Sequence, residues 1–205
     1  MAIKPILFNT EMVRAILDGR KTCTRRVVKT RRKDACGFYV TKRPDGSFAG
    51  IYEYDEDGRM FENQLIPPYK PGDIMYVRET WGEWTDGYLY KAWTEPFPQA
   101  GALPRVKWIP SIHMPKEAAR IWLKVTEVRV ERLKDITEAQ AEKEGFIPQG
   151  LFDGAEITLP ATYWFSKFWN FTIKKSDLDR YGWAANPWVW VIQFERCEKP
   201  EELRR

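Results

Sequence analysis

A short run near the start of the chain gathers a lysine, hydroxyl groups and arginines, which are side chains that activate nucleophiles or hold phosphates. It reads Asp18-Gly19-Arg20-Lys21-Thr22-Cys23-Thr24-Arg25-Arg26. Repulsion from the three arginines favours a neutral, basic amine on Lys21, and such an amine could activate the Thr24 hydroxyl as a nucleophile. The other interpretation is that the lysine and the arginines stay charged and hold phosphate groups. The run alone leaves both open.

A carboxylate later in the chain, Glu144, is a candidate for proton transfer. It lies in the last turn of a helix that the capping-box sequence Thr137-Glu138-Ala139-Gln140 predicts and that Gly145 ends. The helix dipole disfavours a charged carboxylate at that end by about 0.3–1 kcal/mol, which makes the group a better proton acceptor. A solvated acidic helix face is the alternative, since Glu138 and Glu142 share this helix.

A third group of polar and aromatic side chains lies where predicted strands end or proline-bounded loops begin. Tryptophans there could stack on a base, an interaction that contributes about 1–3 kcal/mol per base. The structural alternatives are an ordinary ion pair between Arg78 and Glu79 and a histidine that shapes the loop at Pro110–Pro115. The candidate ligand contacts of this group are Arg78, Glu79, Trp81, Trp108, Ser111 and His113.

Composition excludes several classes of site and of protein. One histidine and three cysteines without C-x-x-C spacing give no support for a zinc site. The sequence also has no glycine-rich motif of the kind that binds phosphate. We therefore expect no metal and no cofactor. The odd number of cysteines indicates reduced thiols in the cytoplasm. Apolar runs are too short for a membrane span, and the N-terminus leads almost directly into a helix rather than a signal peptide.

The net charge of +4 is unevenly distributed along the chain. Between Arg20 and Arg43 there are ten Lys or Arg residues and one acidic residue, Asp34, which gives a local charge of +9. Such a basic segment on a mildly acidic protein indicates an anionic partner, with nucleic acid as the first candidate. A solvated loop is the alternative.

Hydrophobic periodicity and turn residues predict the elements that must position these side chains. We expect one mixed α/β (α+β) domain over residues 1–205, with an inserted hairpin region at about 30–66 and an elaborated loop at about 82–106. A phase shift in the apolar alternation predicts a β-bulge near Thr126. The predicted helices are Met12–Leu17 with Asn9 or Thr10 as N-cap, the capping-box helix, and Ala161–Ile173; the predicted strands are Thr22–Val28, Ile74–Arg78, Arg120–Glu131 and Trp188–Phe194.

The motifs together resemble the ASCH domain family, a branch of the PUA-like fold, in its phage and prophage form. Gly19, Lys21 and Arg26 match the Gly-x-Lys-x-x-x-x-Arg spelling of that family, and the spellings at Val77–Trp81 and Pro110–Pro115 resemble its phage branch. The resemblance implies a strongly bent β pseudo-barrel flanked by short helices.

The resemblance also implies two functions. PUA-like domains bind RNA, and small ASCH proteins are amidohydrolases that remove the acetyl group from acetylated cytidine. Their lysine, threonine and glutamate match Lys21, Thr24 and Glu144 here. The leading hypothesis is a module that binds RNA or a modified nucleoside through a basic, aromatic-lined pocket. The amidohydrolase and a phage structural or assembly protein that docks through the aromatic segment Tyr163–Phe171 are the alternatives.

Overall fold

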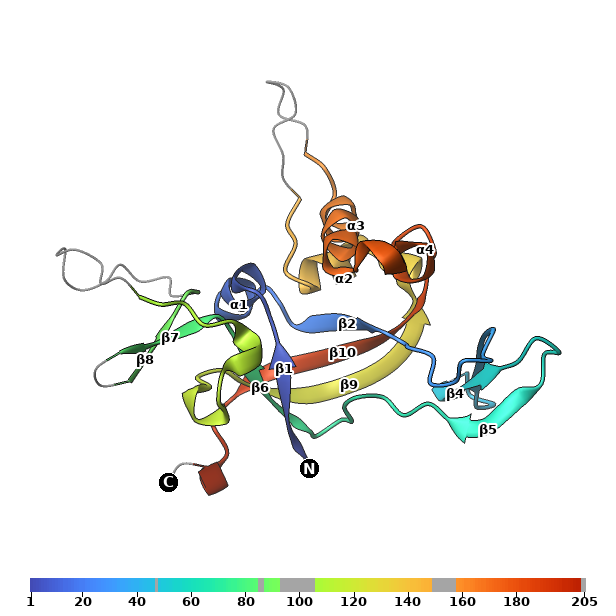
Figure 1. The fold of residues 1–205 in the computed structure, drawn as a ribbon, viewed down its shortest axis with the longest axis horizontal. Helices are drawn as coiled ribbons and strands as arrows, with labels where there is room; N and C mark the ends of the chain where they lie inside the picture. The colour runs from blue at the N-terminus through green and yellow to red at the C-terminus, as the bar shows by residue number, and fades with distance from the viewer. Residues whose placement is uncertain (47, 85–86, 93–105, 149–157, 204–205) are drawn as a thin grey trace.

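A bent mixed sheet forms the centre of the protein (Figure 1). The computed structural model describes residues 1–46, 48–84, 87–92, 106–148 and 158–203. Within them, five strands lie in the order β1-β6-β9-β10-β2, with β1 and β6 parallel and the other neighbours antiparallel. The mixed α+β class with a strongly bent sheet is thus confirmed. These strands are β1 (Ile3–Leu7), β6 (Ile74–Arg78), β9 (Trp122–Arg132), β10 (Trp188–Cys197) and β2 (Cys23–Val27).

The long strands β9 and β10 carry the predicted bulge. Gln193 of β10 pairs with Glu127, whereas the next residue, Phe194, pairs with Val125, so Thr126 is the extra residue on β9. A bulge adds local twist and bends the strand that holds it. The phase shift in the sequence therefore located the bend correctly.

Strand β1 was not predicted from the sequence, because we expected the N-terminus to lead almost directly into the first helix. The strand is short, and Lys4 and Pro5 interrupt its apolar pattern. Proline lacks a backbone N–H, so it is tolerated at the edge of a sheet, and β1 is such an edge.

The predicted helices are present, and they pack against the sheet. Helix α1 (Thr10–Leu17) has Asn9 as its N-cap, and α2 (Glu138–Lys143) has a complete capping box at Thr137. Helix α3 (Ala161–Thr172) packs with α2 on Val189 and Val191 of β10, and α4 (Leu178–Tyr181) follows it. Short 3-10 helices are η1 (Ser111–His113), η2 (Lys116–Ala118), η3 (Leu133–Asp135), η4 (Lys175–Asp177) and η5 (Glu201–Leu203).

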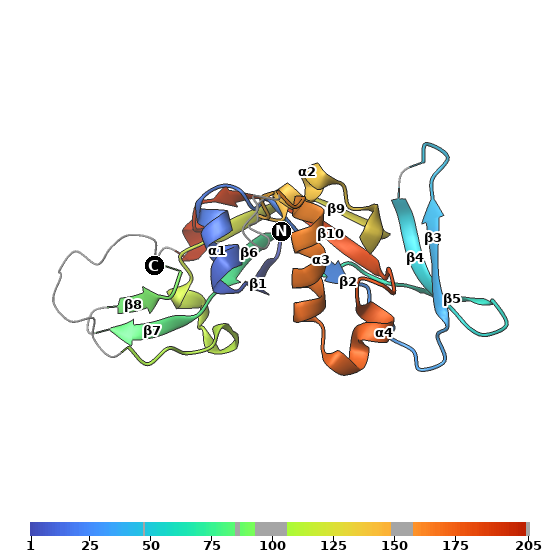
Figure 2. The same cartoon turned by 90° about the horizontal axis from the view of Figure 1, so that it is seen from above.

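Residues of the predicted insertion form a sheet of their own, which lies at one end of the main sheet near α4 (Figure 2). Its strands are β3 (Gly37–Lys42), β4 (Phe48–Tyr54) and β5 (Met60–Gln64). Ile51 and Leu65 pack with Val28 and Trp190 in a small buried cluster, which joins the inserted sheet to the main one.

The hairpin of β7 (Trp81–Trp84) and β8 (Gly87–Tyr90) falls within the predicted loop at about 82–106. Residues 85–86 and 93–105 of that loop lie outside the described residues. None of the described helices is both long enough and apolar enough to span a bilayer.

Candidate functional site

Lys21 and Glu144 form a buried ion pair at the edge of the main sheet. The Nζ of Lys21 donates to Oε2 of Glu144 at 2.6 Å, to the Cys23 carbonyl at 2.8 Å and to the Glu144 carbonyl at 2.9 Å. Each side chain of the pair is 2% exposed or less. All three donors of the ammonium group are thereby used, so the pair is fully hydrogen-bonded on the lysine side.

The surroundings of Lys21 differ from those expected from the sequence. We expected a lysine crowded by arginines, but its bonded charged partner is the carboxylate of Glu144, and Arg20 instead bonds Asp18 and the Gly145 carbonyl. Glu144 is the C-cap residue of α2, as its predicted place near the helix end implied. Two cations, Lys21 and Arg25, offset the unfavourable helix dipole at that position.

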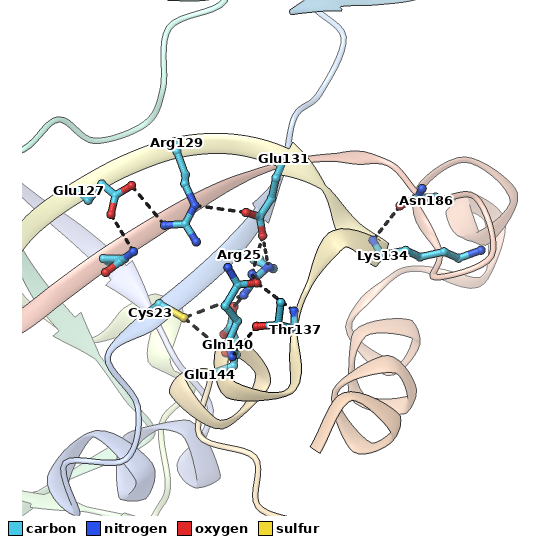
Figure 3. Close-up of polar contacts among 11 residues, drawn as sticks. Cys23, Arg25, Glu127, Arg129, Glu131, Lys134, Thr137, Gln140, Glu144 and Asn186 are labelled. Carbon is cyan, nitrogen blue, oxygen red and sulfur yellow. Dashed lines mark hydrogen bonds and ion pairs between the residues drawn. The ribbon is translucent and has the colours of Figure 1, made fainter. Parts of the chain in front are cut away.

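Arg25 extends the pair into a network that reaches β9 and α2 (Figure 3). Its guanidinium donates to Glu131 at 2.5 Å, to Glu144 at 3.2 Å and to the side chain of Gln140 at 3.1 Å. Burial alone would lower the pKa of Arg25, but the carboxylates of Glu144 and Glu131 raise it. The guanidinium of Arg25 is therefore buried and bound to protein side chains, so it is not on the surface where a phosphate could reach it.

Thr24 lies next to this network but on the other face of β2. It pairs with Ile192 of β10, and its side chain is buried. Among the described residues its hydroxyl makes no hydrogen bond with Lys21. The structure therefore brings Lys21 and Glu144 into contact, whereas the hydroxyl of Thr24, three residues after Lys21, has no hydrogen bond to either within the part of the chain that is described.

The candidates Arg78 and Glu79 do not pair with each other. Arg78 donates to the carbonyls of Met114 at 2.7 Å and Ile112 at 2.5 Å, and so holds the loop that carries His113. Glu79, which is 1% exposed, instead binds Arg120 through both carboxylate oxygens. The expected ion pair was wrong because neighbours in a strand point to opposite faces.

The two candidate tryptophans differ in exposure. Trp81, expected to face a ligand, is 4% exposed because it packs on Met114 and Trp122, and its backbone pairs with Ile109. Its Nε1 is buried without a partner among the described residues. Trp108 is 39% exposed, as expected. Ser111 and His113 lie on η1, half-buried and exposed respectively.

A cavity of about 490 Å³ at the end of β2 is lined by cationic side chains of the basic segment. Three cationic side chains line it, namely Arg26, Lys29 and Arg31, and no acidic residue does so. Among the described residues these three form no ion pair. Tyr69 and Trp190 supply aromatic surface.

Arg26 is the most constrained of these cations. Its guanidinium is half-buried, donates to the Leu7 carbonyl at 3.0 Å and lies 5.5 Å from the centroid of the Phe8 ring. Burial lowers the pKa of Arg26, and Glu144 and Tyr69 act in the opposite direction. Arg26 thus lines a cavity, and its role as a ligand contact stays a prediction.

Sequence reasoning missed the other walls of this cavity. The charge of the basic segment signalled Lys29 and Arg31, but neither Trp190 nor Tyr69 was among the predicted site residues. Glu53 of β4 accepts the backbone N–H groups of Arg31 and Arg32, and so holds this segment against the inserted sheet. No cluster of His, Cys, Asp and Glu suited to a metal is found within the described part of the chain.

Comparisons with known proteins return an ASCH domain. No family model matches the chain, and no curated protein matches it. A search of solved structures finds the crystal structure of an ASCH domain from Lactobacillus crispatus, with a TM-score of 0.43 and 13% sequence identity. The similarity covers 95% of this chain and 79% of that one.

Proposed function

We propose that this protein binds RNA through the cavity of Arg26, Lys29 and Arg31. The observation that carries the proposal is the absence of any acidic side chain from the lining of a cavity that holds three cations. Phosphate oxygens accept hydrogen bonds from arginine and lysine and neutralise them. Tyr69 and Trp190 also line the cavity but are only 8% and 5% exposed, so the proposal rests on the phosphate contacts of the three cations.

A comparison of Arg26 with two other arginines of the described residues supports the proposed binding of phosphate. Arg25 and Arg120 are buried or half-buried, and each binds carboxylates of its own. Arg26 is half-buried with a single carbonyl acceptor. Burial lowers the pKa of Arg26 despite the opposing effect of Glu144, and a bound phosphate would stabilise the charged guanidinium.

The test of this function is the salt dependence of binding. A fluorescently labelled single-stranded RNA is titrated with the protein at several salt concentrations. Binding through phosphate predicts that log K falls with log salt by about 0.7 per contacted phosphate. A flat response would remove the proposal.

A second function, hydrolysis of an acylated nucleoside, is favoured by the contact between Lys21 and Glu144. A proton passed from the ammonium to the carboxylate along their 2.6 Å hydrogen bond would leave a neutral amine. That amine could take the proton of the Thr24 hydroxyl as its oxygen attacks an acyl carbonyl, and Glu144 would give its proton to the leaving amine. Water would then cleave the acyl–Thr24 ester, which releases the carboxylic acid and restores the hydroxyl. The buried state of all three side chains means that a substrate must open the site.

A further inference from the structure

A second cavity, of about 240 Å³, lies along the same stretch of chain as the first. Val28 and Thr30 line both cavities, so the segment that leaves β2 for the inserted sheet borders the two. The second cavity takes its walls from three places: the main sheet, α4 and the inserted sheet. Its lining residues are Val28, Thr30, Cys36, Gly37, Phe38, Tyr54, Arg132, Arg180, Tyr181, Ala185, Pro187 and Trp188.

The second cavity repeats the chemistry of the first. Its cations are Arg132 and Arg180, and no acidic residue lines it. Arg132 lies over the ring of Trp188 at 4.4 Å and donates to the Asn186 carbonyl at 3.1 Å. Arg180 donates to the Thr30 hydroxyl at 2.9 Å. Within the described residues neither arginine is paired with a carboxylate.

The inserted sheet supplies part of the wall of the second cavity. Gly37 and Phe38 of β3 and Tyr54 of β4 line it together with Trp188 of β10 in the main sheet. In Figure 2 this inserted sheet lies beside α4, at the end of the main sheet where β2 and β10 are found.

We propose that the two cavities are neighbouring subsites for one single strand of nucleic acid, which runs between the main sheet and the inserted sheet. The inference rests on the proposed RNA binding and goes beyond it, because it adds a second subsite and makes affinity depend on the length of the strand. A nucleoside or a dinucleotide occupies the cavity of Arg26, whereas a longer strand also reaches Arg132 and Arg180. Alternating cations and aromatic rings are the surface that binds phosphates and unpaired bases.

The experiment compares oligouridylates of two and eight nucleotides by titration calorimetry or anisotropy at low salt. Wild-type protein is expected to bind the longer RNA at least about tenfold more tightly, which corresponds to stacking and phosphate contacts at one added subsite. Arg132→Gln and Arg180→Gln should each lose most of this gain and leave dinucleotide binding unchanged. Arg180 is exposed, so its variant is expected to fold normally. Arg59→Gln, which removes a charge from the inserted region outside both cavities, is the matched control.

The outcomes separate this inference from the function on which it rests. Equal affinity for both lengths, or an octanucleotide affinity that Arg132→Gln and Arg180→Gln leave intact, overturns the two-subsite inference while dinucleotide binding retains the proposed function. Absence of binding at either length overturns both. Oligothymidylate of eight nucleotides shows whether the sugar matters. Binding of polyglutamate in place of RNA, sensitive to the same two substitutions, would assign the second cavity to an acidic peptide and overturn the inference.

Discussion

Lys21 and Glu144 are 123 positions apart in the chain, yet their side chains meet at 2.6 Å in a site that solvent barely reaches. Lys21 lies two residues before β2 and Glu144 is the C-cap residue of α2, and the backbones of the two residues form an isolated bridge. A buried pair of this kind can stabilise the fold, move a proton, or do both. Stability and activity measurements on the same variants separate these roles.

The asymmetry of this pair predicts unequal effects on stability. Glu144→Leu leaves Lys21 without a charged partner and is expected to destabilise the protein by about 3–5 kcal/mol. Lys21→Met should cost less, because Arg25 still neutralises Glu144. Urea denaturation followed by tryptophan fluorescence measures both free energies of unfolding. An equal or reversed order would show that Arg25 does not support Glu144.

Two glycines that end helices make a matched comparison. Gly19 and Gly145 both have positive φ, at 76° and 99°. A Cβ on Gly145 would lie 2.8 Å from the Cβ of Ala15 and 3.3 Å from that of Lys21, whereas one on Gly19 would meet nothing within 4 Å. Gly19→Ala should cost about 1–2 kcal/mol for the left-handed backbone alone. Gly145→Ala should destabilise the protein more than Gly19→Ala, because the added methyl group also meets Ala15 and Lys21. Melting temperatures of the two variants test this, and an equal loss in both would contradict it.

The cysteines are expected to differ in reactivity. Burial, with help from Glu144, raises the pKa of the Cys23 thiol from 9.0 to about 12. Cys36 is exposed. At about pH 8 an alkylating reagent should therefore label Cys36 first, and leave Cys23 unlabelled until the protein unfolds. Mass spectrometry of the labelled peptides checks this, and early labelling of Cys23 would contradict its burial.

The same shift gives a pH dependence of stability. The folded state holds the Cys23 proton more tightly than the unfolded state, so its contribution is complete below about pH 9 and falls as the pH rises toward 12. Cys23→Ala should flatten that part of the stability profile. An unchanged alkaline slope in the variant would assign it to other groups.

The hydrolase alternative makes a prediction about Thr24. If its hydroxyl is the nucleophile, purified protein hydrolyses acetylated cytidine, and Thr24→Ala abolishes turnover with an unchanged melting temperature. Lys21→Met should abolish turnover as well. Chromatography of the products follows the reaction. A folded wild-type protein that leaves the substrate intact would count against this hydrolysis.

Local signals in the sequence predicted much of the fold. The cap at Asn9, the capping box at Thr137 and the bulge at Thr126 depend on residues close together in the chain, and the structure has all three. Strand β1 was not predicted, since its five residues gain order from a parallel partner about seventy positions away.

The candidate site was harder to predict, because its partners are distant in sequence. Lys21 and Glu144 were named through family motifs, but the spacing of residues could not show that Arg25 binds Glu131 or that Arg120 takes Glu79. The sequence showed the positive charge of the basic segment, but it could not show which of the cations form ion pairs in the folded protein. The cavity depends on Tyr69 and Trp190, which the fold brings from either side.

The account depends most directly on Arg26. We would measure the affinity of single-stranded RNA for wild type and Arg26→Gln across a salt series, with Arg59→Gln as a charge-matched control. The account predicts that Arg26→Gln weakens binding about tenfold or more, because hydrogen bonds to charged groups contribute about 1.5–3 kcal/mol. The slope of log K against log salt should become less steep by about 0.7, which is the contribution of one phosphate contact. The affinity and slope of the control should stay near those of the wild type. Equal losses in the two variants, or an unchanged affinity for Arg26→Gln, would contradict it.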